Sequence, residues 1–114
     1  MDLSNRVAIV TGSGQGIGRE IALMLAEQGA SLVISDVNAA TAKEVAAEIE
    51  AKNGKGIAIP VNVAVAAEVS KLVEQTLSSF GHIDILVNNA GITRDGLLMR
   101  MSESDWDLVL NINL

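Results

Sequence analysis

Thr11-Gly12-Ser13-Gly14-Gln15-Gly16-Ile17-Gly18 is a glycine-rich stretch that directly follows the short β-rich run at residues 6–11. The G-x-G-x-x-G fingerprint does not fit, because Ile17 and Arg19 occupy the two places where its third glycine could stand. A phosphate loop does not fit either, because no glycine is followed five positions later by Gly-Lys. The register that fits is T-G-x-x-x-G-x-G. Such a turn leads from a strand into a helix, brings backbone close to a pyrophosphate and points helix N-terminal amides at it.

Asp36 ends the next β-rich run, 18 residues beyond Gly18. An acid at about 20 residues from such a loop hydrogen-bonds the adenosine ribose hydroxyls of a dinucleotide. A carboxylate there would repel a 2′-phosphate, and neither Gln15 nor Val37 supplies a compensating positive charge. The pattern therefore favours NAD over NADP. The alternative is a tight strand-to-helix turn with Asp36 solvated at a strand end, but strand, glycine register, helix and acid all agree with the cofactor site.

Strand-like and helix-like segments alternate along the chain, which predicts a parallel sheet covered by helices. Pro60 removes one ladder donor, which indicates a sheet edge or a strand end, and the third strand is expected to be the edge strand. Gly29 stands where a left-handed C-terminal cap is expected, and His82 beside Gly81 is expected to be a solvated turn residue. The predicted strands are residues 6–11, 31–36, 57–61 and 83–87. The predicted helices are residues 17–28, 42 to about 53, 69–80, and one that begins at residue 102.

Composition narrows the class of protein. The chain has 114 residues, 49% of them apolar, which predicts one domain or part of one and excludes disorder. A net charge of −6 argues against nucleic acid as a partner. The absence of cysteine and the single histidine exclude disulfides, a thiolate nucleophile and the usual zinc sites, so no metal is expected. No apolar run is long enough to span a bilayer and no signal peptide is recognisable, so a cytoplasmic protein without membrane contact is expected.

Several further segments occur in the order found in one known family. Together with the glycine loop, Asn62-Val63, Asn88-Asn89-Ala90-Gly91 and the segment from Trp106 to Asn113-Leu114 resemble the N-terminal half of the short-chain dehydrogenase/reductase family. Within that family, residues 88–101 are most similar to 3-oxoacyl-acyl-carrier-protein reductases. The resemblance implies an α/β Rossmann-type, three-layer α/β/α fold with a parallel sheet in the order 3-2-1-4. It also implies that residues 1–114 are the dinucleotide-binding half of one domain, ending before its C-terminal strands.

The resemblance also implies which residues contact the cofactor. Asp36 would hold the adenosine ribose, and Asn62 and Val63 would meet the adenine, although many relatives carry Asp in place of Asn62. Asn113 matches the asparagine that organises a proton-relay water beside the catalytic lysine, and it is the single catalytic candidate. The full set of expected cofactor-binding residues is Gly12, Ser13, Gln15, Gly16, Ile17, Gly18, Asp36, Val37, Asn62, Val63, Asn88, Ala90 and Gly91.

The family's proton donor is the phenol of a Tyr-x-x-x-Lys motif, and this sequence contains no Tyr. The resemblance therefore implies that a longer parent protein transfers hydride between a nicotinamide cofactor and a 3-oxoacyl thioester or similar ketone, and that this chain alone is inactive. Expected partners are the dinucleotide, the thioester or small ketone, an acyl-carrier protein attracted by Arg94 and Arg100, and further copies in a homo-oligomer. Two alternatives remain open: a non-catalytic nucleotide-binding module and an inactive folding fragment.

Overall fold

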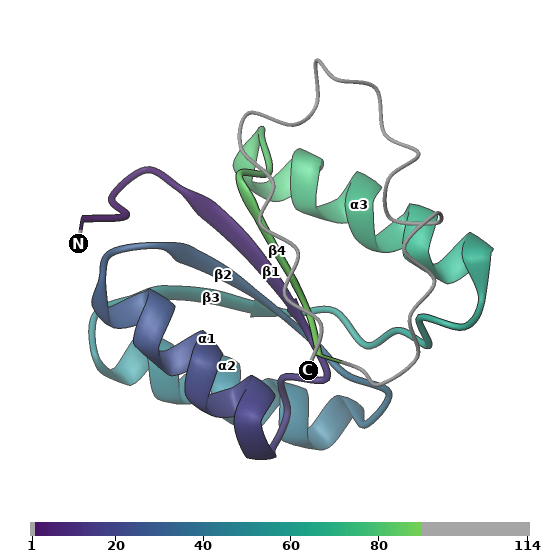
Figure 1. Ribbon diagram of the computed structural model, residues 1–114, viewed down its shortest axis with the longest axis horizontal. Coiled ribbons are helices and arrows are strands. Elements are labelled where there is room, and N and C mark those ends of the chain that lie inside the picture. Colours follow the sequence, from purple (N-terminus) through teal and green to yellow (C-terminus); the bar gives the residue numbers. More distant parts are fainter. Residues whose placement is uncertain (1, 90–114) are drawn as a thin grey trace.

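The computed structural model describes residues 2–89, which form an alternating series of strands and helices (Figure 1). The strands are β1 (Val7–Thr11), β2 (Ser31–Ser35), β3 (Lys55–Ala58) and β4 (Ile85–Asn88), and the helices are α1 (Gly16–Glu27), α2 (Ala39–Ala51) and α3 (Ala66–Phe80). The predicted alternation is confirmed over this range. The helix expected from residue 102 lies outside the described residues.

All strand pairs are parallel, and the sheet has the order β3-β2-β1-β4, which confirms the expected 3-2-1-4 arrangement. Thr11 at the end of β1 is in register with Ser35 of β2 and with Asn88 of β4. The carboxyl ends of three strands therefore lie level. The loops that follow them start from one edge of the sheet, where ligands of open α/β sheets bind.

The sheet is covered on both faces, by α1 and α2 on one side and by α3 on the other (Figure 1). Side chains alternate between the two cores, so Ala8 and Val10 of β1 pack with α1 and α2 while Ile9 packs with α3. All five residues of β1 and all four of β4 are buried. Burial on both faces explains why these strands read as continuous apolar runs.

The third strand begins earlier than expected, at Lys55, and ends at Ala58 rather than at residue 61. Beyond it, Ile59 N–H donates to the carbonyl of Ile34 at 3.0 Å, and Val61 N–H donates to the carbonyl of Asp36 at 3.2 Å. Pro60 lies between these two donors, at a position whose nitrogen is not needed for pairing with β2. The proline ends the regular ladder without detaching the chain, and the expected edge position is confirmed.

A polar cluster joins the N-terminal ends of β1 and β4, and it includes His82, which is exposed between α3 and β4 as expected. The His82 Nε2 lies 2.9 Å from the carbonyl oxygen of Asn5 and 2.9 Å from Oδ2 of Asp84, so the exposed ring also contacts the residues that precede β1 and β4. Asp84 is buried, accepts from Val7 N–H at 2.7 Å and pairs with Arg6 at 3.4 Å. Strand register brings these residues together from 77 or 78 positions apart.

The left-handed cap expected at Gly29 after α1 is observed, with φ +100°, and Gly81 after α3 has φ +86° as well. At the start of α2, the side chain of Asn38 caps the helix by accepting from Thr41 N–H at 3.2 Å. Within residues 2–89, no helix combines the length and the apolar character that crossing a bilayer requires.

Candidate dinucleotide-binding site

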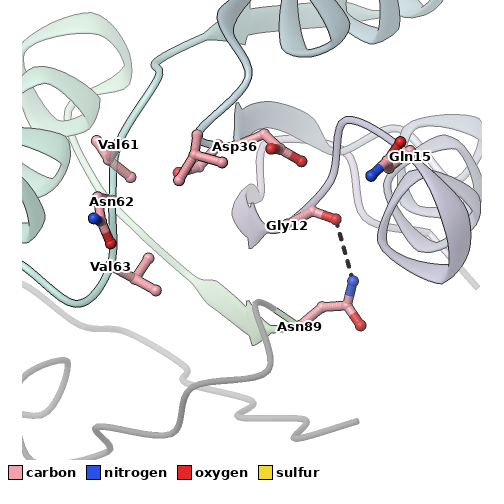
Figure 2. A pocket seen from close by; sticks show the side chains of 9 residues that line it. Gly12, Gln15, Asp36, Val61, Asn62, Val63 and Asn89 are labelled. Carbon is pink, nitrogen blue, oxygen red and sulfur yellow. Dashed lines mark hydrogen bonds between the residues drawn. The ribbon is translucent and has the colours of Figure 1, made fainter.

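A cavity of about 310 Å³ opens at the carboxyl edge of the sheet, between the glycine loop, the end of β2 and the segment that leads into α3 (Figure 2). Its size is at the lower end of the range typical of small-molecule sites. Its described lining residues are Gly12, Gln15, Ser35, Asp36, Val37, Val61, Asn62, Val63 and Asn89. Six of the residues expected from sequence thus meet around one cavity: Gly12, Gln15, Asp36, Val37, Asn62 and Val63.

The glycine loop has a backbone that only glycine adopts readily. Gly12 and Gly16 have φ of +63° and +61°, in the left-handed region. At Gly18 the requirement is space, because a Cβ there would overlap the Gly12 carbonyl and the side-chain amide of Asn89. The three glycines of the T-G-x-x-x-G-x-G register therefore fold the loop tightly against the start of α1.

The N-terminus of α1 lies at the rim of this cavity. Its N-cap, Gln15, lines the cavity and makes no side-chain cap hydrogen bond, and no acidic residue occupies the first helical turn. The amides of a first turn have no acceptor within their own helix, and they carry the positive end of the helix dipole. This end of α1 has the properties of a phosphate-binding helix start.

Ser13 is placed differently from the expected cofactor contact. Its side chain is buried, its hydroxyl donates to the carbonyl of Val10 at 2.5 Å, and its oxygen accepts from Ser35 N–H at 3.0 Å. The Ser13 side chain therefore links the glycine loop to β2, and Ser13 does not belong to the cavity lining.

Asp36 is the only ionisable residue in the described lining, and its carboxylate is held by two backbone amides. Oδ2 accepts from Gly14 N–H at 2.9 Å, and Oδ1 accepts from Asn38 N–H at 3.1 Å. A carboxylate oxygen has two lone-pair directions, so each oxygen keeps capacity for a ligand hydroxyl. The side chain is half-buried at the mouth of the cavity and presents a fixed negative charge there.

The closest cation in sequence to the glycine loop, Arg19, is engaged elsewhere. Its Nε donates to Oε1 of Glu48 at 3.2 Å, and a second guanidinium nitrogen, Nη2, bonds Oε2 of the same carboxylate, which ties α1 to α2. The hydrogen bonds and charge of Glu48 raise the pKa of Arg19 above its ordinary value. This guanidinium does not line the cavity, so no Lys or Arg in the described lining offsets Asp36.

Another wall of the cavity is formed by the turn at residues 61–65. Asn62 N–H donates to Oε1 of Glu68 in the first turn of α3 at 2.8 Å, and Oδ1 of Asn62 accepts from Ala64 N–H at 3.0 Å. These two bonds fix the turn, so that the side chains of Val61 and Val63 border the cavity beside Asn62 (Figure 2). The side-chain oxygen of Asn62 accepts this hydrogen bond as an Asp carboxylate oxygen would, and it keeps one lone pair for a ligand.

Asn89 is a lining residue that sequence reasoning missed. Its Nδ2 donates to the Gly12 carbonyl at 3.2 Å (Figure 2), and its backbone N–H donates to the Thr11 hydroxyl at 3.0 Å. Asn88, which was expected to line the cofactor, is instead buried, and its Oδ1 accepts from Thr11 at 3.1 Å. Because successive side chains along a strand point to opposite faces, the alternation at the end of β4 was the signal that could have separated the two asparagines.

The remaining expected residues lie beside the cavity or beyond the described range. Ile17 is 63% exposed at the start of α1, and Gly16 and Gly18 shape the loop without lining the cavity. Ala90, Gly91 and Asn113 lie outside the described residues. Among residues 2–89 there is also no group of three His, Asp or Glu placed to hold a metal ion.

Comparison with known proteins gives a consistent picture. The family described as "short chain dehydrogenase" matches residues 6–114. The chain is 44% identical over its whole length to "(2S)-[(R)-hydroxy(phenyl)methyl]succinyl-CoA dehydrogenase subunit BbsD" of Thauera aromatica, and covers 46% of that protein. It is 50% identical over 98% of its length to a 3-oxoacyl-[acyl-carrier-protein] reductase of Synechocystis sp., again covering 46% of that protein. The chain thus spans about half the length of the curated relatives it matches.

Solved structures agree with these relatives. A hydroxysteroid dehydrogenase from Escherichia coli superposes with a TM-score of 0.78 and 44% identity, over 80% of this chain and 39% of that one. A 7α-hydroxysteroid dehydrogenase complexed with NADH and 7-oxo glycochenodeoxycholic acid superposes with a TM-score of 0.76 and 38% identity, over 91% of this chain and 40% of that one.

Proposed function

Because this chain belongs to the short-chain dehydrogenase family, we propose that its cavity binds the adenosine half of NAD and that the whole protein is an NAD-dependent oxidoreductase acting on a ketone or alcohol. Bound NAD would supply the hydride acceptor, and NADH the hydride donor. Residues 1–114 would form the dinucleotide-binding half of one Rossmann domain.

The observation that carries the proposal is the Asp36 carboxylate, fixed by two backbone amides at the mouth of a cavity whose described lining holds no cation. A ribose with free 2′- and 3′-hydroxyls would donate to it. A 2′-phosphate would instead bring two further negative charges beside the carboxylate. Repulsion between these like charges would raise the free energy of binding. The 7α-hydroxysteroid dehydrogenase structure, which is complexed with NADH, supports the same preference.

The other residues divide the dinucleotide between them. The N-terminus of α1 would face the pyrophosphate, and the absence of a side chain at Gly18 lets the start of α1 pack against the Gly12 carbonyl. The turn that includes Asn62 and Val63 would border the adenine. Asn88 would support the end of β4 through Thr11, and Ala90 and Gly91 would continue the cofactor wall. Asn113 would organise the proton-relay water, beside a Tyr and a Lys that a longer chain supplies.

The substrate class we propose is an acyl thioester that carries a ketone or hydroxyl group. The curated relatives at 44–52% identity are named for acyl groups on coenzyme A or on an acyl-carrier protein. An acyl-carrier protein is then a candidate partner. The solved structures named for hydroxysteroids reach 44% identity, so a steroid alcohol is the competing substrate class.

The test uses the whole protein that contains these residues. Calorimetric titration should give a dissociation constant for NAD at least about tenfold below that for NADP, since one hydrogen bond to a charged group contributes about 1.5–3 kcal/mol. NADH oxidation should then be faster with acetoacetyl thioesters than with oxosteroids. Tighter binding of NADP would refute the role of Asp36, and turnover of oxosteroids alone would refute the substrate class.

A further inference from the structure

We propose that Gly14, the one glycine of the loop outside the T-G-x-x-x-G-x-G register, is a positioning residue that sets the orientation of the Asp36 carboxylate and thereby the recognition of the ribose hydroxyls; this inference rests on the proposed function. Gly14 does not have a positive φ, so the turn itself does not require glycine there. The requirement comes from its surroundings.

Two features connect Gly14 to Asp36. The backbone N–H of Gly14 donates to Oδ2 of Asp36 at 2.9 Å, across 22 positions of sequence. A Cβ on Gly14 would stand 2.9 Å from that same oxygen, 3.1 Å from the Asp36 Cγ and 2.5 Å from the Thr41 hydroxyl oxygen. Real Cβ atoms essentially never show contacts below 3.0 Å, so a side chain at position 14 must displace Thr41, Asp36 or the loop.

Thr41 has little freedom to move away. Its hydroxyl donates to the Asn38 carbonyl at 3.1 Å, and its N–H donates to the Asn38 side chain at 3.2 Å, as part of the cap of α2. Asn38 in turn donates its own N–H to Oδ1 of Asp36 at 3.1 Å. Asp36 is therefore held between the glycine loop and the start of α2. Because Gly14 has no side chain, the amides of both Gly14 and Asn38 can approach the carboxylate.

A side chain at position 14 would change the orientation of the Asp36 carboxylate and leave its charge unchanged. Hydrogen bonds weaken steeply when the donor–acceptor angle departs from linear, so a rotated carboxylate keeps its repulsion of a 2′-phosphate but loses its bonds to ribose hydroxyls. A substitution at Gly14 should thus reduce recognition of the ribose 2′-hydroxyl specifically. A general loosening of the site would weaken all nucleotides alike.

The experiment compares AMP with 2′-deoxy-AMP as ligands of the whole protein, measured by calorimetry. The unmodified protein should bind AMP about tenfold more tightly, the effect of one hydrogen bond to a charged acceptor. The informative variant is the double change Gly14→Ala with Thr41→Ala, which removes the shortest overlap and leaves the one with Asp36. Thr41→Ala alone is the matched control, because it leaves both amide bonds to Asp36 in place.

In the double variant the AMP preference should fall below about threefold, while Thr41→Ala should keep the unmodified value. Thermal unfolding and circular dichroism establish that both variants are folded, and the ligand ratio is read within each protein, so reduced stability does not imitate the effect. A folded double variant that keeps the tenfold preference would overturn the inference. If the unmodified protein itself does not distinguish the two nucleotides, the role of Asp36 in the proposed function fails as well, which separates the two failures.

Discussion

Replacing Asp36 with Asn tests whether one negative charge decides the choice between NAD and NADP. The change keeps the shape and one acceptor oxygen, so one of the Gly14 and Asn38 amides keeps a neutral acceptor while the other faces the new NH2 group. Hydrogen bonds to charged groups contribute about 1.5–3 kcal/mol and neutral ones about 0.5–1.5, so NAD should bind about 1–1.5 kcal/mol more weakly, close to tenfold. Removing repulsion of a 2′-phosphate at the half-exposed carboxylate should strengthen NADP binding by about 1–2 kcal/mol.

The ratio of the two dissociation constants should therefore change by about 100-fold in favour of NADP. Adding Gln15→Arg, at a residue that lines the same cavity, should increase the change further by giving the 2′-phosphate a bidentate partner. Titration calorimetry of the whole protein with each cofactor measures both constants. Glu44→Gln, which removes one exposed charge on α2 away from the cavity, is the control for net charge. Parallel weakening of both cofactors by Asp36→Asn would refute the electrostatic explanation.

Four further substitutions test the packing of the site and of the sheet. Gly18→Ala should lower the free energy of unfolding by about 1–3 kcal/mol and weaken NAD binding, because the added methyl group overlaps backbone; denaturant unfolding and titration measure the two effects, and an unchanged midpoint would contradict the loop geometry. Ser13→Ala should lower the free energy of unfolding by about 1–3 kcal/mol, because it leaves buried hydrogen-bonding groups unpaired. Ser35→Ala should leave the free energy of unfolding unchanged or raise it, because the buried Ser35 hydroxyl has no partner among residues 2–89. Equal losses in the two variants would be evidence against this difference. Asp84→Ala should lower the free energy of unfolding by about 1–3 kcal/mol, because it leaves the buried N–H of Val7 at the start of β1 without an acceptor. NAD affinity, measured under native conditions, should stay unchanged, because the cavity lies at the opposite end of the sheet. An unchanged free energy of unfolding would refute the stabilising role of Asp84.

Much of the fold was readable before the structure. Strand and helix periodicity located every element of residues 2–89 to within a few positions, and Pro60 correctly marked the edge strand. These features are local, because they depend on the spacing of apolar residues and on backbone chemistry within one segment. The shift of the third strand shows the limit, because pairing with β2, and not local propensity, decides where the ladder begins and ends.

The site was readable only in part. The glycine register and the spacing of Asp36 predicted residues that do border one cavity. The roles of Ser13, Asn88 and Asn89 were not readable, because each is set by a partner on another strand. Ser13 bonds β2 at 22 positions' distance, and Asn89 reaches the Gly12 carbonyl from 77 positions away. These partners decide whether a polar side chain is used in a hydrogen bond within the fold or is exposed to the cavity.

The sequence by itself therefore determined the order of elements, the place of the glycine loop and the acid that follows it, because each is written within one strand–turn–helix segment. Only the tertiary structure decided that Gly14 contacts Asp36, that Arg19 is engaged with Glu48, and that Asn89 instead of Asn88 borders the cavity. The physical reason is register: once the strands pair in parallel with Thr11 level with Ser35 and Asn88, distant loops meet at one edge, and hydrogen-bond geometry across that edge selects which side chains remain available to a ligand.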